Sequence, residues 1–570
     1  MRYLSAIIFC FLNIYAISQN LEWAKSIGSS DHDWYRDIFI TKNNDIISFG
    51  DYTATIDLDP GSGTSIHSYS GGSDVFVQRL DVNGNYMWSK SWGNGGYGNV
   101  ILDMAEDKYG NLYFTGSYGG TLDFDPGNGV FSLTSVLFQD IFILKLDSNG
   151  NFLWAKSMGG SQTDQGTSIL VDENLNIYIG GLFSTIVDFD PNVGIKNLTS
   201  NGSYDVFIQK LDSSGNLVWV YGYGDWYADD VANLSQDGLG NIYISGTFTG
   251  NVDFNFSAGI DTLDGNSDVY VLKIDTNASF QWVKYFDGPL GIEFVTDMEI
   301  DKNGNIYLVG GFGQNNMPGG AVVDFDPSGS VVSGINSGEE DIFEVSLDSA
   351  GNFRWLNKIG GAYNDRGMGL ALDNLGNVFF VGAYEGSVDF DTGPGVDVLS
   401  TYAVWPGVYT DRLYLHATDT NGLHEWAFYF GGDVGNTANI AANNFDKLLL
   451  NGSYKGGGGD FDPNSGTVTL PSYGSGDDAF ILKFNSFPVS IEMQNLNNNF
   501  SVYPNPVIDV IYIQSEEKLE SIEIIDLSGR KVLMDLNSNN EINVSNLSSG
   551  VYILRAIFEQ GVFTHKFIKE

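Results

Sequence analysis

Residues 167–224 read TSILVDENLNIYIGGLFSTIVDFDPNVGIKNLTSNGSYDVFIQKLDSSGNLVWVYGYG, and this stretch decides the fold. It contains four runs rich in Val, Ile, Phe and Tyr, at 167–172, 176–181, 205–212 and 217–224. Runs of this length, bounded by glycine and asparagine, are typical of β-strands. Joints such as DSSGN at 212–216 place a glycine where a short hairpin needs a positive φ. The stretch therefore predicts a four-stranded antiparallel meander.

The same unit recurs along the chain. Its last strand carries a tryptophan, and seven such tryptophans follow one another at intervals of 63 to 73 residues: Trp23, Trp88, Trp154, Trp219, Trp282, Trp355 and Trp426. A four-stranded meander cannot cover both of its faces alone, so it must stack on copies of itself. Seven such sheets stacked radially form a β-propeller. We therefore predict an all-β protein whose main part is a seven-bladed propeller of four-stranded blades.

The two ends of the repeat region predict how the ring closes. The seventh unit lacks a tryptophan strand after the run DAFILKFN at 478–485, whereas an extra tryptophan strand at 20–28 precedes the first complete unit. Pairing this N-terminal strand with the run at 478–485 would remove both exposed sheet edges. An open solenoid would need capping units and would have no use for this offset. The pattern favours a closed ring.

These units resemble the seven-bladed β-propeller repeats of bacterial extracellular proteins. The resemblance rests on the GN-aromatic strand, for example NIYIGG at 176–181, on the run that opens with aspartate, for example DVFIQKLD at 205–212, and on the tryptophan strand. It covers about residues 20–486. The resemblance implies a propeller in an extracellular setting, and it implies no common activity.

The repeats stop near residue 488, and a stretch with a proline and an asparagine cluster, 489–499, forms a linker. Alternating strands in residues 500–570 predict a small β-sandwich. This segment closely resembles the type A C-terminal sorting domain of the type IX secretion system, on the motif residues Pro504, Asn505, Pro506, Gly529, Arg530, Gly550, Lys566 and Lys569. The resemblance implies contact with that secretion machinery. It also implies delivery beyond the outer membrane of a Gram-negative bacterium, to the cell surface or into the medium.

The N-terminus is consistent with export. Residues 1–18 combine one cation, a short apolar run and small residues before Gln19, which predicts a signal peptide. The only cysteine, Cys10, lies inside this segment. No later stretch approaches the roughly 18 continuous apolar residues that a membrane helix needs, so we expect no transmembrane span.

Composition excludes several classes of protein. With 42% hydrophobic and 14% aromatic residues the chain has enough apolar surface to fold. Its 71 acidic and 27 basic side chains give a net charge of −44, which repels the phosphates of nucleic acids, so we expect no nucleic-acid partner. Residues 490–570 hold only 11 acidic and six basic side chains, so most of the acidity belongs to the propeller, residues 19–488.

The acidity concentrates in Asp-x-Asp elements, mostly DFDP, between the second and third strands of each unit. Two carboxylates two residues apart on an extended chain point the same way and offer oxygen ligands to Ca²⁺. The Ca²⁺ candidates are Asp123, Asp125, Asp188, Asp190, Asp324, Asp326, Asp389, Asp391, Asp460 and Asp462. The alternative, which we favour, is that the first aspartate caps a turn by accepting backbone N–H groups and no metal is needed.

Catalytic motifs are sparse. None of the five histidines lies at metal-ligand spacing or in a nucleophile motif, and the pattern places His416 where other units carry Arg79, Lys145, Lys210, Lys273 or Lys483. The sixth unit breaks the repeat with STYAVWPGVYT at 400–410, which brings Tyr402, Trp405 and Tyr409 onto one loop as candidate ligand-binding residues. Such rings stack on sugars or anchor protein partners, or they fold down onto the blade as local core.

We therefore expect a non-catalytic, monomeric binding or scaffold protein outside the cell, with an extracellular glycan or protein as its ligand, for example as an adhesin. The alternative is an extracellular hydrolase acting on polysaccharide or protein. Two non-repeating carboxylates that face one another, or a histidine beside a serine, would favour the hydrolase.

Overall fold

The computed structural model describes residues 21–96, 98–256, 259–288, 292–313, 322–373, 376–401, 403–405, 408–432, 434–443, 447–456, 459–463, 466–485, 501–503, 506–514, 519–526, 531–535, 541–548, 550–558 and 561–569. The predicted signal peptide and linker lie outside these residues. Strands account for all the regular structure among them, and no helix with the length and apolar content of a membrane span occurs in the described ranges.

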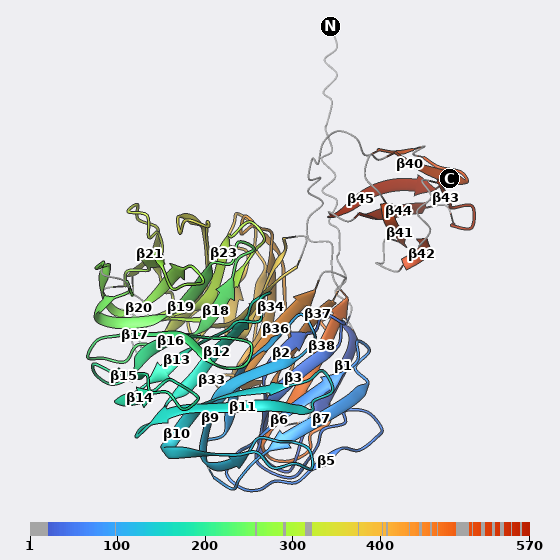
Figure 1. Ribbon diagram of the computed structural model, residues 1–570. Helices are drawn as coiled ribbons and strands as arrows, with labels where there is room; N and C mark the ends of the chain where they lie inside the picture. Colours follow the sequence, from blue (N-terminus) through green and yellow to red (C-terminus); the bar gives the residue numbers. More distant parts are fainter. Residues whose placement is uncertain are drawn as a thin grey trace. The chain divides into compact units, whose positions relative to one another are not determined.

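Seven four-stranded antiparallel sheets form the blades of a closed propeller (Figure 1), which confirms the predicted fold. In blade order, and from the inner strand outwards, the strands are β2 (Asp33–Ile40), β3 (Ile46–Tyr52), β6 (Asp74–Leu80) and β7 (Tyr86–Trp92); β8 (Val100–Glu106), β9 (Leu112–Asp123), β10 (Ser132–Leu146) and β11 (Phe152–Gly160); β12 (Gln165–Val171), β13 (Ile177–Phe183), β16 (Asp205–Leu211) and β17 (Leu217–Tyr223); β18 (Asn233–Gln236), β19 (Ile242–Asp253), β20 (Thr262–Ile274) and β21 (Phe280–Tyr285); β22 (Ile292–Ile300), β23 (Ile306–Gly313), β26 (Glu340–Leu347) and β27 (Phe353–Ile359); β28 (Arg366–Leu372), β29 (Val378–Tyr384), β34 (Arg412–Thr418) and β35 (His424–Phe430); β36 (Val434–Asn443), β37 (Lys447–Lys455), β38 (Asp477–Asn485) and β1 (Leu21–Ile27).

The ring closes as the sequence predicts. Strand β1 pairs antiparallel with β38 and supplies the outermost strand of the seventh blade, with Trp23 opposite Lys483. Lys483 Nζ also binds Glu22 at 2.8 Å and donates to the carbonyl of Val82 in the first blade at 3.1 Å. The N-terminal strand is therefore tied to the last blade, and Lys483 joins that blade to the first.

Side chains of the two innermost strands join neighbouring blades through backbone groups. Thr167 Oγ1 donates to the carbonyl of Val231 at 2.7 Å, from the third blade to the fourth. Asn451 Nδ2 donates to the carbonyl of Asp37 at 2.7 Å, from the seventh blade to the first. Each such bond gives a backbone carbonyl of the next blade a side-chain partner at the blade interface.

The Asp-x-Asp element also builds the core. The side chain between its two aspartates points opposite to both of them, because side chains alternate along an extended chain. This apolar residue is at most 2% exposed in every blade: Leu58, Phe124, Phe189, Phe254, Phe325, Phe390 and Phe461. It packs against aromatic residues of its own blade; Phe189, for example, lies 4.7 Å from Phe207 between ring centroids.

Short ribbons extend the blades where the second strand connects to the third. They are β4 (Ile56–Asp57) with β5 (Ile66–His67), β14 (Ile186–Asp188) with β15 (Asn197–Thr199), β24 (Val322–Asp324) with β25 (Ser333–Ile335), and β30 (Ser387–Asp389) with β31 (Val398–Ser400). The sixth blade adds β32 (Ala403–Trp405) with β33 (Val408–Tyr409). In the second and fourth blades the ribbon continues the long strands β9–β10 and β19–β20.

The C-terminal unit, Ser490–Glu570, is separate from the propeller unit, Leu21–Val489. One of its sheets contains β39 (Ser501–Tyr503), β40 (Val510–Gln514) and β43 (Glu541–Asn543); the other contains β42 (Lys531–Asp535), β41 (Leu519–Asp526), β44 (Gly550–Phe558) and β45 (Gly561–Lys569). Buried residues of both sheets, among them Ile511 and Leu554, belong to one apolar cluster, as expected of a small sandwich.

Ring closure generates the first prediction. A chain that begins at Gly28 lacks β1 and leaves the edge of β38 unpaired, so we expect a lower melting temperature and self-association through that edge. Thermal unfolding and light scattering after gel filtration measure both effects. The matched control begins at Leu21 and retains β1. Equal melting temperatures and equal masses for the two chains would contradict the role of β1.

Candidate functional site

The first aspartate of each Asp-x-Asp element caps its own loop. Asp123 Oδ1 accepts the backbone N–H groups of Asp125 at 3.1 Å and of Phe131 at 2.8 Å. The same two bonds, from the residues two and eight places along the chain, recur at Asp57, Asp188, Asp253, Asp324, Asp389 and Asp460. This uniform geometry supports the turn-capping interpretation.

The second aspartate holds the tip of the same loop. Asp125 Oδ1 accepts the N–H of Gly127 at 2.8 Å, and a Cβ added at Gly129 would overlap Asp125 Oδ2. The same overlap occurs at Gly63, Gly194, Gly395 and Gly466. No group of three or more His, Cys, Asp or Glu side chains suited to a metal ion occurs within the described part of the chain. Binding of Ca²⁺ at the ten candidate aspartates stays a prediction.

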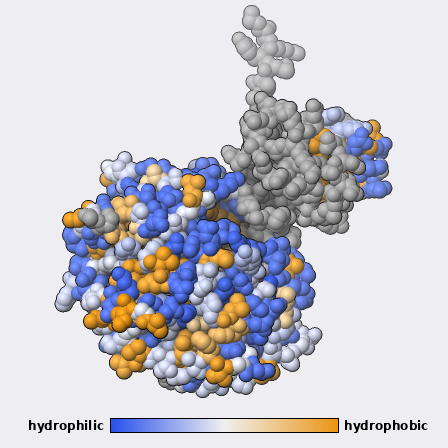
Figure 2. Space-filling model, in the orientation of Figure 1, coloured by the Kyte–Doolittle hydropathy of each residue, from blue (hydrophilic) through white to orange (hydrophobic). Residues whose placement is uncertain are grey.

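The loops on the face that carries the Asp-x-Asp elements also expose apolar side chains. The extent of this exposure differs from blade to blade. In the second blade Val136, Leu137 and Phe138 are 59%, 70% and 56% exposed, in an irregularity between β9 and β10. Between the third and fourth blades Trp226 and Tyr227 are 73% and 58% exposed. Elsewhere on the propeller, in the view of Figure 2, apolar side chains form small patches among hydrophilic ones.

Trp226 and Tyr227 lie in the crossover from β17 to β18. Hydrogen bonds join this crossover to the loop before β16, the third strand of the third blade, and so place it on the same face. The carbonyl of Trp226 accepts the N–H of Ser203 at 3.3 Å, and Asn201 Nδ2 donates to the carbonyl of Gly224 at 3.0 Å. The sequence-based search missed this pair. The sequence feature that could have revealed the pair is the crossover GYGDWYADD at 222–230, which carries two adjacent aromatic residues.

The predicted aromatic loop of the sixth blade is described only in part. Tyr402 lies outside the described residues, and Trp405 and Tyr409 are described only as backbone, in β32 and β33. Their role as ligand-binding residues stays a prediction.

His416 does not lie where the sequence pattern placed it, so that prediction is wrong. Strand β34 starts one residue later than the pattern implies, and Ala417 pairs with Phe379 as Lys145 pairs with Tyr113. His416 pairs with Phe380 instead, at the position that Leu144 occupies in the second blade. The shift of one residue turns His416 to the opposite face of the strand, where it is fully buried.

His416 belongs to a chain of four ionisable side chains, of which His416 and Glu344 are fully buried. Its Nδ1 lies 2.8 Å from Glu344 Oε1 of the fifth blade, and its Nε2 lies 3.1 Å from His424 Nδ1. His424 Nε2 in turn lies 3.1 Å from Asp397 Oδ2, and the hydrogen bond from His424 lowers the pKa of Asp397. The chain links two blades, and His416, His424 and Glu344 do not recur at the equivalent positions of the other described blades, whereas Asp261 of the fourth blade is equivalent to Asp397.

A second histidine, His67 in β5, lies beside serines. Its Nδ1 is 2.7 Å from Ser91 Oγ, and its Nε2 is 2.8 Å from Ser89 Oγ. Burial lowers the pKa of His67. A Ser-His-Asp triad needs a carboxylate on the second ring nitrogen, and here a second serine takes that place. The arrangement therefore lacks the orienting acid of a hydrolase triad.

Carboxylates also gather on the inner strands. Asp103 Oδ2 accepts the N–H of Ile169 at 2.7 Å, and Asp297 Oδ2 accepts the N–H of Leu370 at 2.9 Å, so each bonds the next blade. Burial raises the pKa of both Asp103 and Asp297 to about 6. Burial, with the charges of these and neighbouring acids, raises the pKa of Asp37 well above its ordinary value and that of Glu299 to about 8.

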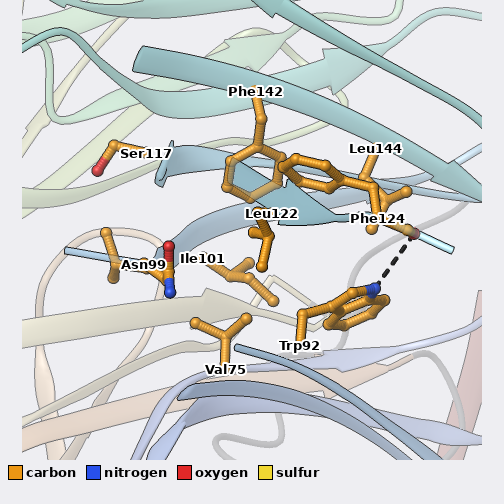
Figure 3. A pocket seen from close by; sticks show the side chains of 10 residues that line it. Val75, Trp92, Asn99, Ile101, Ser117, Leu122, Phe124, Phe142 and Leu144 are labelled. Carbon is orange, nitrogen blue, oxygen red and sulfur yellow. Dashed lines mark hydrogen bonds between the residues drawn. The ribbon is translucent and has the colours of Figure 1, made fainter. Parts of the chain in front are cut away.

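An apolar pocket lies between the first and second blades (Figure 3). Its lining includes Val75, Trp92 and Phe142, which belong to the buried core, and Trp92 Nε1 donates to the carbonyl of Phe124 at 3.1 Å. Asn99 and Ser117 supply its polar side chains. We interpret the pocket as a packing space between blades.

The predicted sorting motif is described in part. Pro504, Asn505, Gly529 and Arg530 lie outside the described residues. Pro506 is exposed, Gly550 begins β44, and Lys566 and Lys569 lie in β45, where Lys569 is 7% exposed.

The loop geometry predicts that capping dominates over metal binding. Replacing Asp123 with Ala removes the oxygen that accepts two backbone N–H groups, so we expect a loss of about 1–2 kcal/mol of unfolding free energy in urea. Excess Ca²⁺ should leave the melting temperature of the full chain unchanged relative to a chelator, because only a ligand that binds the folded state raises it. A rise with Ca²⁺ that Asp123→Ala abolishes would reverse the assignment.

The buried pair of His416 and Glu344 predicts strong coupling between two blades. The variant His416→Leu leaves Glu344 Oε1 buried without its partner and should cost about 3–5 kcal/mol of unfolding free energy. Leu144 and Val77 occupy the two equivalent positions in other blades, so the double variant Glu344→Val/His416→Leu should recover at least half of that loss. Additive losses in the double-mutant cycle would show that the pair is not coupled.

Comparisons with known proteins agree with this architecture. Residues 501–570 match the family described as secretion system C-terminal sorting domain, and residues 153–189 match the family described as β-propeller repeat. The sorting domain marks the protein as one exported to the cell surface or secreted, and it implies interaction with the type IX secretion machinery.

Two curated relatives are similar in sequence. An uncharacterized WD repeat-containing protein of Acanthamoeba polyphaga mimivirus is 22% identical over 76% of this chain, and regulatory protein FlaEY of Caulobacter vibrioides is 25% identical over 30% of it. The aligned regions span 36% and 18% of the lengths of these two relatives.

Two solved structures align along most of this chain at low similarity. The extracellular domain of a one component system from B. thetaiotaomicron has a TM-score of 0.20 and 11% identity, covering 96% of this chain and 98% of that one. PorZ, an essential bacterial surface component of the type-IX secretion system of Porphyromonas gingivalis, has a TM-score of 0.17 and 10% identity, covering 96% of this chain and 100% of that one. The chain is a seven-bladed β-propeller, one of whose repeats matches the β-propeller repeat family, followed by a secretion system C-terminal sorting domain.

Proposed function

We propose that this exported propeller is a non-catalytic binding or scaffold protein that takes an extracellular glycan or protein as its ligand. The observation that carries the proposal is the unequal exposure of apolar side chains on one face, above all Trp226 at 73% and Tyr227 at 58%. The scaffold repeats in every blade, whereas these side chains do not. Contiguous exposed apolar side chains, unlike single ones, are a mark of interaction sites.

The chemistry of this face supports two kinds of ligand. Aromatic rings stack on the apolar faces of sugars and also anchor protein partners. The surrounding acidity, part of a net charge of −44, disfavours anionic ligands and favours neutral or basic ones. A ring without an exposed blade edge needs no second copy to complete it, which supports a monomer.

A binding screen tests the proposal. The full chain is screened against an array of glycans and against the secreted proteins of the producing organism, and each hit is titrated with the double variant Trp226→Ala/Tyr227→Ala. We expect at least about tenfold weaker binding, because hot-spot aromatics commonly contribute more than about 1.4 kcal/mol each.

The matched control is Tyr109→Ala. Tyr109 is 70% exposed, and it lies in a hairpin between a first and a second strand, on the opposite face of the ring. Equal loss of binding in both variants would contradict a site at Trp226, and unchanged binding in both would do so as well. Unchanged folding is verified from the melting temperature.

An extracellular hydrolase is the second candidate function. The inner-strand carboxylates favour it, because burial raises the pKa of Glu299 to about 8, and a carboxyl group that holds its proton near neutral pH suits a general acid. The variant Glu299→Gln, assayed for release of reducing sugar or peptide from the substrates of the screen, separates this function from binding.

A further inference from the structure

Pairs of buried acids lie where one blade meets the next. The first member lies in a third strand, and the second lies in or just before the inner strand of the following blade. Five such pairs are described, and all ten side chains are at most 2% exposed: Asp140 with Asp164, Asp205 with Asp229, Asp268 with Glu293, Asp341 with Asp365, and Asp478 with Asp33. We call these five pairs the junction pairs.

Each member of a junction pair closes its own loop. Asp140 Oδ2 accepts the N–H of Val136 at 3.1 Å. Asp164 Oδ2 accepts the N–H of Gly160 at 2.8 Å, and its Oδ1 accepts the N–H of Ser184 at 2.9 Å. The hydrogen bonds to Asp205 and Asp229 repeat this pattern in the next blade. The carboxyl groups are therefore fixed in place by the backbone of two blades.

In the pair of Asp205 and Asp229 the two carboxyl groups flank one glycine. A Cβ added at Gly224 would lie 2.7 Å from Asp205 Cγ and 2.7 Å from Asp229 Oδ2. Added Cβ atoms at Gly159, Gly360, Gly288 and Gly28 would likewise overlap a junction carboxyl group. Only a residue without a side chain permits this close approach, so the pair is packed tightly against the backbone.

Oxygen atoms of these pairs lack hydrogen-bond partners. They are Oδ1 of Asp140, Asp205 and Asp478, and both oxygens of Glu293. Within the described residues a cationic side chain approaches a single pair, where Lys358 Nζ lies 3.8 Å from Asp341 Oδ2. Two buried anions without a cation repel each other strongly, so one of them must be neutralised.

At the two remaining blade junctions, other residues replace one of the acids and so remove this charge. At the junction of the first and second blades, Asp74 is matched with Asn99, which lines the pocket in Figure 3. In the sixth blade, Arg412 pairs with Tyr384 exactly where Asp140 pairs with Tyr118, and its Nη1 donates to the carbonyl of Gly431. An amide or a cation therefore replaces one acid at the other two junctions.

We propose that each junction pair shares one proton between its two carboxyl groups, and that these protons hold neighbouring blades together. The protonated acid donates an O–H to its ionised partner, which gives the orphaned oxygen a hydrogen bond and leaves one charge per pair. A proton needs no additional space. A Ca²⁺ ion takes about 6–8 oxygens at about 2.3–2.6 Å, which two carboxyl groups packed on a glycine do not provide.

The pKa values of the pairs agree with this proton count. Burial raises the pKa of Asp140, Asp205 and Asp268 to about 6, of Asp33, Asp164 and Asp229 to about 7, of Asp365 to about 8 and of Glu293 to about 9. Burial also raises the pKa of Asp341 and Asp478.

Other ionisable groups face the junction pairs. Tyr118 faces Asp140; Asp225 faces Asp205 and Asp229; Asp287 faces Asp268 and Glu293; Lys358 faces Asp341; Glu385 faces Asp365; Asp31 faces Asp33; and Asp477 faces Asp478. Apart from Lys358, these groups are acids or a phenol, so they oppose ionisation of the pairs.

The sign of the pH dependence follows from these raised values. A group whose pKa is higher in the folded state binds more protons when folded, so it stabilises the fold fully below its unfolded pKa of about 4. This contribution is lost as the pH rises through the folded values. The stability of the propeller should therefore fall between about pH 6 and about pH 9.

The experiment compares the full chain with the variant Asp140→Asn, which mimics the neutral acid as Asn99 does. The matched control is Asp125→Asn, in the same blade and half-buried at a loop tip. We expect infrared spectra at neutral pH to show the carbonyl stretch of protonated carboxyl groups, weaker in Asp140→Asn and unchanged in Asp125→Asn. The melting temperature should fall by several degrees from about pH 5 to about pH 9, and less steeply in Asp140→Asn.

Three results would overturn the proposal. The first is the absence of the protonated-carboxyl band from the full chain at neutral pH, a measurement that needs no variant. The second is an equal band and an equal pH slope in Asp140→Asn and the full chain. The third is a melting temperature raised by Ca²⁺ in the full chain and not in Asp140→Asn, which would assign the pairs to a cation. If Asp140→Asn does not fold, Asp164→Asn tests the same pair.

Discussion

The pairing of β1 with β38 is the contact on which the rest of the propeller depends. It joins residues more than 450 positions apart and completes a blade whose other three strands come from the opposite end of the repeat region. Every contact between the seventh and the first blade, such as Asn451 Nδ2 with the carbonyl of Asp37, requires the ring to be closed. Without that contact the chain would be a curved stack with two unprotected edges.

Aspartate is the main building element of this ring, and it has three structural roles. In the hairpins, as at Asp147, a carboxylate accepts N–H groups of the turn. In the Asp-x-Asp loops, as at Asp123, it accepts N–H groups two and eight residues along the chain. At the blade junctions it lies beside a second acid. A large part of the net charge of −44 therefore serves the scaffold. Ligand recognition falls to the few loops that depart from the repeat.

The sequence was sufficient for the blades, the closing strand and the turn-capping aspartates, because each depends on local pattern or on the count of repeats. It was insufficient where two blades meet. Asp140 and Asp164 are separated by a whole strand and a crossover, so their contact exists only in the folded ring. His416 was misplaced for another reason: one residue, Asp411, precedes the strand instead of starting it, and a shift of one residue exchanges the two faces of a strand.

The position of β1 also has a consequence for biosynthesis. Strand β1 can pair only after residues 477–485 have been made, so during translation and export its edge stays open while about 450 residues follow. Contacts over so long a separation form slowly, because closing the loop costs entropy before the contact repays it. The topology of the propeller therefore keeps the ring open while the chain is unfolded for transport. The ring can close only once the whole repeat region is available for folding.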